Sequence, residues 1–175
     1  MKKKILKRVA ILSIAMVTIS LSAGAQERGD MAAGANLLFG TTSGYSNIGF
    51  GANFKYNIID QVRLAAEFDY FLKKDYVSMW SVNVYGHYLF SVADNVIIYP
   101  LAGLGIIGAT NSYPAYSLFG YDTPAGSLSS SHFDFAIGGG AEYDLTSHFA
   151  LNGELRLQFD AGIFFCVALG AAYKF

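Results

Sequence analysis

Hydrophobic residues alternate with polar or small ones along most of the chain after residue 30. Successive side chains of a β-strand point to opposite faces, so a period of two predicts strands rather than helices. Turn-like interruptions divide the alternation into eight segments. The sequence therefore predicts strands at residues 31–39, 48–56, 62–72, 80–90, 96–106, 133–143, 149–159 and 165–175.

Charged residues distinguish the two faces of these strands. The third segment carries three charges, and so do the sixth and seventh when Asp144 and Asp160, which directly follow them, are included; within each set the three charges share one face. The opposite face is aliphatic and aromatic. Segment 96–106 is apolar on both faces, so alternation alone does not set its register; we assign Val96, Ile98 and Pro100 to the apolar face.

The direction of the apolar face separates two all-β classes. In a soluble sandwich the apolar face packs inward, whereas in a membrane barrel it meets lipid and the polar face fills the lumen. The polar face is rich in glycine and alanine, which suit a narrow lumen better than a solvated surface. The strands are also long enough to cross a membrane at a tilt. These features predict an all-β fold, an eight-stranded antiparallel up-and-down transmembrane β-barrel.

Aromatic residues on the apolar face gather at the strand ends, in two sets with aliphatic residues between them. Following the chain up and down places each set at one level, which is typical of the two aromatic girdles of a membrane barrel. One set comprises Phe39, Tyr70, Trp80, Phe133, Phe135, Phe159 and Phe165. The other comprises Phe54, Tyr56, Tyr88, Phe90, Tyr143, Phe149, Tyr173 and Phe175.

The connections also differ between the two ends of the predicted barrel. If the chain starts on the periplasmic side, the turns at 58–61, 91–95 and 145–148 lie there and are all short. The connections at the other end are 40–47, 73–77, 109–131 and 160–162, of which only 109–131 is long. Short periplasmic turns and longer extracellular loops are the outer-membrane pattern. A soluble secreted calyx, with the apolar face enclosing a ligand, is the alternative.

The first 25 residues read as a cleaved signal peptide. Five basic residues lie within residues 1–8, an apolar stretch covers residues 9–21, and Ala23-Gly24-Ala25 fits the small-x-small cleavage rule. Cleavage near Ala25/Gln26 would leave residues 26–175 as one exported barrel domain.

Composition and charge narrow the classes further. Of the 175 residues, 53% are hydrophobic and only 14% are charged, which excludes intrinsic disorder. Beyond residue 8 the chain has seven basic against 13 acidic residues, whereas a nucleic-acid binder would usually be basic. The lone Cys166 excludes an intrachain disulfide and a cysteine-rich zinc site. No segment after residue 25 offers 18 uninterrupted apolar residues, so a helical membrane protein is not expected.

The chain resembles the family of small eight-stranded outer-membrane β-barrels, to which the transmembrane domain of outer-membrane protein A belongs. The resemblance rests on the signal peptide, the glycine-rich stretch 99–105, the stretch 149–156 and the alternating C-terminal end 170–175. It implies location in the outer membrane, in contact with lipid and lipopolysaccharide. It also implies that the last strand, with Tyr173 and Phe175, is the signal for the barrel-assembly machinery. The family hosts inert, adhesive and enzymatic members, so the resemblance does not set an activity.

The polar face carries a candidate cluster of luminal charges. An eight-stranded barrel is only wide enough inside for side chains, so a large pore is not expected. The charges then form either a buried salt-bridge plug, which we favour because buried charges must be paired, or a proton or small-ion path. The cluster consists of Arg63, Glu67, Asp69, Glu142, Glu154 and Arg156.

Catalytic and metal chemistry find little support in the sequence. His87, His132 and His148 are scattered, with no metal-ligand spacing, and no cofactor is implied. Ser131, His132 and Asp134 suggest a lipid A-modifying enzyme as the minority alternative, since a nucleophile needs a base and an orienting acid within reach.

Loop 109–131 is the better candidate for function because it is rich in tyrosine and serine, which favour adaptable recognition. Its candidate residues are Tyr113, Tyr116, Phe119 and Tyr121. We therefore expect a structural or surface-interaction role, with an unidentified surface ligand and no nucleic-acid partner. A narrow ion or small-solute channel is the other alternative.

Overall fold

The computed structural model describes residues 27–42, 45–118, 121–160 and 162–175 of the chain, and these residues form strands joined by short turns. No helix among them is long and apolar enough to cross a membrane. The strands are β1 (Met31–Thr42), β2 (Tyr45–Ile59), β3 (Val62–Lys74), β4 (Val77–Tyr88), β5 (Phe90–Ala93), β6 (Val96–Tyr113), β7 (Tyr116–Leu118), β8 (Tyr121–Thr123), β9 (Gly126–Asp144), β10 (Phe149–Phe159) and β11 (Ile163–Lys174).

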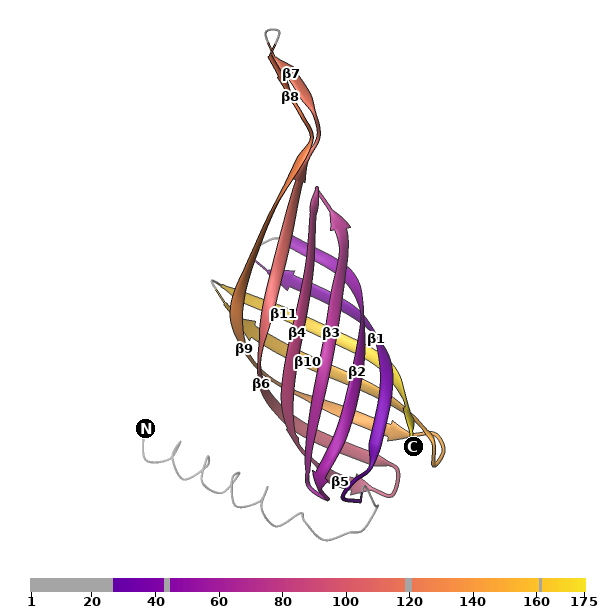
Figure 1. Cartoon of the computed structure of the whole chain (residues 1–175). Coiled ribbons are helices and arrows are strands. Elements are labelled where there is room, and N and C mark those ends of the chain that lie inside the picture. The colour runs from indigo at the N-terminus through magenta and orange to yellow at the C-terminus, as the bar shows by residue number, and fades with distance from the viewer. Residues whose placement is uncertain (1–26, 43–44, 119–120, 161) are drawn as a thin grey trace, which may run out of the picture.

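The main sheet closes on itself as a barrel (Figure 1). Neighbouring strands of the wall pair antiparallel in the order β1, β2, β3, β4, β6, β9, β10 and β11, and β1 pairs with β11 to complete the ring. β4 and β5 both pair with β6 and keep the same register from His87 to Ser91, with a shift only between Ser91 and Ala93, so together they form one strand of the wall. The predicted eight-stranded antiparallel up-and-down barrel is therefore confirmed.

A proline explains the interruption between β4 and β5. His87 pairs with Leu101 and Phe90 pairs with Ile98, but the residues between them do not pair across to Tyr99 and Pro100. Proline has no N–H group, so β6 cannot donate a backbone hydrogen bond at Pro100. The wall is therefore locally weaker on the β4 side of Pro100.

The faces of the strands follow the alternation in the sequence. Outward residues such as Leu37, 71% exposed, alternate with buried residues such as Asn36. In β6, Ile98 is exposed whereas Ile97 and Tyr99 are buried, which confirms the register assigned to segment 96–106.

The connection predicted as loop 109–131 is not a loop over most of its length. β6 and β9 stay paired beyond the barrel, from Ala109 opposite Ser130 to Tyr113 opposite Gly126. β7 and β8 continue this ribbon as a short second hairpin, which projects well above the other strands (Figure 1). We call residues 109–131 the projecting hairpin. Residues 109–113 and 126–131 are partly or fully exposed on both faces, so these strand segments lack the apolar alternation that identified the others.

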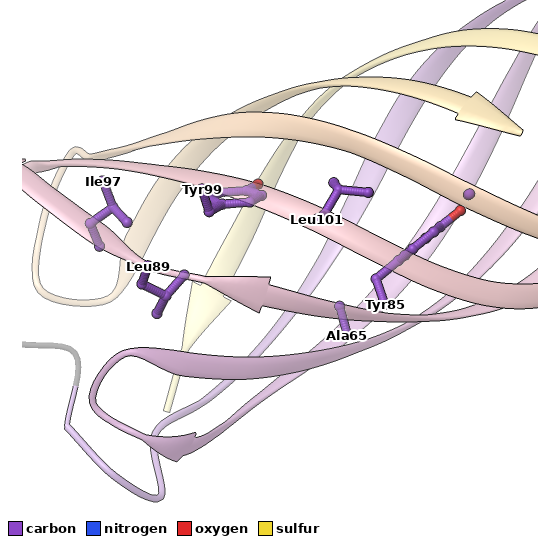
Figure 2. Close-up of a cluster of buried hydrophobic side chains, with 7 residues drawn as sticks. Ala65, Tyr85, Leu89, Ile97, Tyr99 and Leu101 are labelled. Atoms are coloured by element: carbon purple, nitrogen blue, oxygen red, sulfur yellow. The ribbon is translucent and has the colours of Figure 1, made fainter. Parts of the chain in front are cut away.

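The sequence suggested a luminal face of polar and small residues, but this face also carries large apolar and aromatic side chains. Tyr85, Tyr99, Leu89, Ile97 and Leu101 form a buried cluster along the inner side of β4, β5 and β6 (Figure 2). A second apolar cluster fills the lumen near the hairpin end of the barrel, where Leu38, Phe71 and Phe164 pack together.

Candidate functional site

All six predicted luminal charges are buried in the barrel interior, at 1–3% exposure. They separate into two clusters. In the first, Arg156 on β10 lies at the centre of three carboxylates: it contacts Glu67 directly, Asp69 at 3.3 Å and Glu154 at 3.8 Å. These partners come from both sides of the barrel, so Arg156 ties β10 to β3 across the lumen.

The second cluster lies nearer the chain termini and centres on Glu142 of β9. Lys55 Nζ and Arg63 Nη1 each lie 3.0 Å from Glu142 Oε2. Lys174 Nζ lies 3.5 Å from Glu142 Oε1 and also contacts Asp144. A cavity of about 300 Å³ opens beside this cluster at the terminal end of the barrel.

Stacked rings and guanidinium groups connect the two clusters. The rings of His87 and Tyr99 stack with their centroids 4.6 Å apart. The Arg63 guanidinium lies over the same Tyr99 ring, 4.9 Å from its centroid. Tyr99 donates a hydrogen bond of 2.7 Å to Glu154, and Arg156 lies 5.4 Å from the centroid of Tyr85. The two clusters thus form one continuous filling of the lumen.

Several members of this filling were not among the predicted site residues. Lys55 and Lys174 were not in the predicted charge cluster, and Tyr85 and Tyr99 had no assigned role. Their position on the same face as neighbouring charges was the available signal. The two tyrosines were not predicted as members of the luminal site because aromatic residues are expected on the lipid side.

Luminal glycines make room for these long side chains. A Cβ atom at Gly138 would lie 2.1 Å from Leu155 O and 3.1 Å from the Cα of Arg156. At Gly140 it would lie within 2.8 Å of Tyr99 and Glu154 side-chain atoms. The expected match between small luminal residues and a narrow interior is therefore confirmed.

The apolar cluster at the hairpin end completes the filling. The Phe71 and Phe164 rings meet edge to face at 5.2 Å, and both lie where a Cβ atom of Gly40 would be. Leu38 and Cys166 belong to the same cluster, so Cys166 is a buried packing residue. Polar side chains in the middle of the lumen are thus covered by apolar ones on this side.

The residues of the enzymatic alternative are not assembled into a catalytic set. Ser131 and His132 are exposed, whereas Asp134 is buried and accepts a hydrogen bond from Gln158. His87 lies in the lumen, and His148 lies in an exposed turn beside Ser147. Within the described ranges no group of His, Cys, Asp and Glu side chains has metal-binding geometry.

The candidate recognition residues lie along the projecting hairpin. Tyr113 ends β6, and its ring covers Gly126 on the opposite strand. Tyr116 and Tyr121 belong to β7 and β8, and Phe119 lies outside the described residues. Tyr173 and Phe175 lie at the terminal rim, where both are exposed and their rings are 5.5 Å apart.

The outer surface carries the predicted aromatic sets. Tyr70 and Trp80 are paired residues of β3 and β4 near the hairpin end, and Phe135 and Phe159 are paired on β9 and β10. At the other end Phe149 pairs with Tyr173. An aliphatic exterior between two aromatic belts, around a closed barrel with a filled lumen, defines a membrane-spanning β-barrel.

Comparisons with known proteins place this barrel in the outer membrane. Residues 10–175 match the model of the outer membrane protein beta-barrel domain, so the chain belongs to that family. No curated protein matches the chain.

Three solved structures illustrate the shared fold. The attachment invasion locus protein Ail of Yersinia pestis is 19% identical, with a TM-score of 0.57 over 85% of this chain and 99% of that one. The N-terminal β-barrel domain of Pseudomonas aeruginosa OprF is 18% identical, with a TM-score of 0.60 over 86% and 100%. Neisserial surface protein A is 18% identical, with a TM-score of 0.57 over 87% and 96%.

Proposed function

We propose that this protein is an outer-membrane barrel whose lumen does not pass solutes. Its role is to hold the projecting hairpin outside the cell for surface interaction. The observation that carries the proposal is the contrast between a packed lumen and a structured extension. The lumen is occupied by paired charges and by the Phe71–Phe164 contact. Side chains that are packed and paired in this way favour a scaffold over a diffusion pathway.

The projecting hairpin has the character of a recognition element on a rigid support. Its backbone is paired up to Tyr113 and Gly126, and Thr110 and Ser129 hydroxyls contact each other at 3.0 Å across it. Preorganised elements lose less conformational entropy on binding than flexible loops do. Function is often carried by segments that a rigid scaffold positions in this way.

Two further partners follow from the proposed placement. The aliphatic exterior and its aromatic belts would lie against outer-membrane lipid, with lipopolysaccharide around the hairpin end. The exposed Tyr173 and Phe175 at the end of the chain would be available to the barrel-assembly machinery during biogenesis. A cleaved signal peptide over residues 1–25, which lie outside the described residues, would deliver the chain to the periplasm.

Conductance and adhesion together test the proposal. We expect purified wild-type protein to show no discrete channel openings in a planar lipid bilayer, and regular openings would support the channel alternative instead. Cells that carry the wild type should adhere to a surface coated with heparin or with gelatin, whereas cells carrying a barrel that lacks residues 113–129 should not.

The two coatings represent different ligand chemistries. The Ail structure includes a complex with a heparin analogue, and gelatin presents extended polypeptide. The truncated barrel must first pass a folding control, an SDS-gel mobility shift on boiling, because a closed barrel has no free edge to open. Equal adhesion of the two strains, or adhesion of neither, would contradict the surface role.

A further inference from the structure

One edge of the projecting hairpin has no neighbouring strand. β9 pairs with β6 through Gly126, but its pairing with β10 ends at Phe135 opposite Phe159. Among the described residues, nothing pairs with residues 126–134 on the side away from β6. This open edge is nine residues of extended backbone. Trp80 pairs with Gly108, and Gly108 pairs with Ser131, so most of the edge lies beyond the aromatic set that contains Trp80, on the hairpin side.

The other edge of the hairpin is protected. β4 pairs with β6 as far as Val77 opposite Asn111, and Ser112 N donates a hydrogen bond of 2.8 Å to Tyr76 O. The asymmetry arises because β4 extends as far as the hairpin base whereas β10 stops short. The backbone donors and acceptors on the exposed side of β9 are thus directed away from the barrel wall.

The open edge also lacks the features that usually prevent strand addition. Natural proteins protect exposed edges with lysine, proline, bulges or very short strands. Residues 126–133 contain no charged residue other than His132 and no proline, the inward-pointing Asp134 lies at the barrel end of the edge, and the β6–β9 register runs without a shift. Four of the nine are serines, whose short side chains leave the backbone accessible.

We propose that the open edge of β9 binds an extended segment of an external polypeptide by strand addition. In this binding mode main-chain hydrogen bonds supply affinity, and alternate side chains of the added segment supply specificity. Asp160 directly follows the last paired residue of β10 and is exposed beside the edge, so a basic residue at that end of the added segment is favoured. This inference rests on the proposed surface role and names its ligand class.

A second copy in the same membrane does not fit this edge. In every copy β9 runs from the hairpin into the membrane. Two copies related by a twofold axis along the membrane normal therefore have β9 strands that tilt by equal angles in opposite directions. With strand tilts of about 40°, the two strands would cross at about 80° instead of aligning. The occupant therefore has to approach from outside the membrane.

Amide hydrogen exchange of the folded barrel in lipid nanodiscs tests the proposal. The probes are a synthetic peptide with the sequence of residues 106–113, the segment of β6 that naturally pairs with residues 126–133, and an alternating valine–lysine peptide of equal length. We expect at least one probe to slow exchange at the alternate amides of residues 126–134 that face away from β6 and are open in the free barrel. The same peptide N-methylated at alternate residues, which cannot form the ladder, should not.

A pair of proline variants locates the edge. Adjacent residues of a strand direct their N–H groups to opposite sides, so of Ser130→Pro and Ser131→Pro one removes an open-edge donor and the other a donor to β6. The variant that loses the open-edge donor should weaken peptide binding at least tenfold while the hairpin amides stay protected. The variant that loses the donor to β6 should disrupt the hairpin. Failure of both peptides to protect alternate amides would overturn the proposal.

The remaining outcomes separate this inference from the proposed function. Hairpin-dependent adhesion without alternate-amide protection would leave the surface role in place and reject strand addition. Slow exchange in purified protein without added peptide, at the amides that face away from β6, would indicate a second copy in an opposed orientation, and would also overturn the proposal. Peptide protection without hairpin-dependent adhesion would reject the surface role while retaining the binding edge.

Discussion

Replacement of Arg156 by methionine tests whether the luminal charges stabilise the barrel. The guanidinium group is 1% exposed and lies among Glu67, Asp69 and Glu154, with Tyr85 beneath it. Methionine fills part of the volume but supplies no charge and no hydrogen bond. Three carboxylates from two sides of the lumen would then face one another without a cation.

The expected cost follows from the number of partners. At an effective dielectric constant near 20, each contact at about 4 Å amounts to about 4 kcal/mol of gross attraction, and desolvation offsets most of the sum. Removal of one partner of a buried ion pair nevertheless costs about 3–5 kcal/mol, because the remaining charge is left uncompensated. With a urea slope of about 2 kcal/mol per M, the unfolding midpoint in lipid vesicles should fall by about 2 M.

Two further variants make the test specific. Glu67→Gln in the Arg156→Met background should recover part of the lost stability, because it removes one of the uncompensated carboxylates. Lys73→Met removes an exposed cation and should change the free energy of unfolding by less than about 1 kcal/mol. A midpoint for Arg156→Met equal to that of the wild type would refute the reasoning that the luminal ion pairs hold the barrel together.

Three other predictions concern the wall, the belt and the C-terminus. Gly138→Ala should lower the unfolding free energy by about 1–3 kcal/mol in the same urea titration, because its Cβ would meet Leu155 O. Gly139→Ala is the control: its Cβ would lie on the outer face, 3.2 Å from Tyr99 O, and the change should cost less than about 1 kcal/mol. Fluorescence of Trp80, the single tryptophan, should be quenched more by lipids brominated near the headgroup than by lipids brominated near the chain terminus; the reverse order would place the upper aromatic set at the wrong depth. Deletion of Phe175 should slow assembly in proteoliposomes that contain the assembly machinery but not spontaneous folding into detergent, and equal slowing of both would mean that Phe175 acts through stability alone.

The alternation in the sequence was sufficient for the class and the faces of the barrel. In a membrane barrel, lipid and lumen lie on opposite sides of the same strand, so the environment of each residue is set by its parity. The common parity of Arg63, Glu67 and Asp69 therefore predicted their burial correctly. Parity also places Phe71 and Phe164 on the luminal face, where both are buried, but the expectation that luminal residues are polar or small failed for them, because an apolar residue is tolerated on either face.

The composition of the site depended on contacts that parity does not encode. Arg156 meets Glu67 across 89 residues of sequence, and Lys55 meets Glu142 across 87. Which residues share a level of the lumen is set by the stagger between strands and by the closure of β1 on β11. No local pattern records that stagger, so six of the luminal charges could be listed from the sequence, but their partners could not be assigned.

The hairpin and its open edge are the clearest products of tertiary structure. Beyond the membrane both faces of β6 and β9 are solvated, so burial no longer imposes a period of two and the sequence resembles a loop. The open edge arises from a difference in length between β9 and β10, which becomes visible only when the strands are placed side by side. The sequence by itself determined a closed barrel with a polar interior, because lipid and lumen leave a local signature in every strand. The three-dimensional structure alone decided how that interior is paired and which backbone edge remains available, because both depend on the relative positions of strands that are distant in the chain.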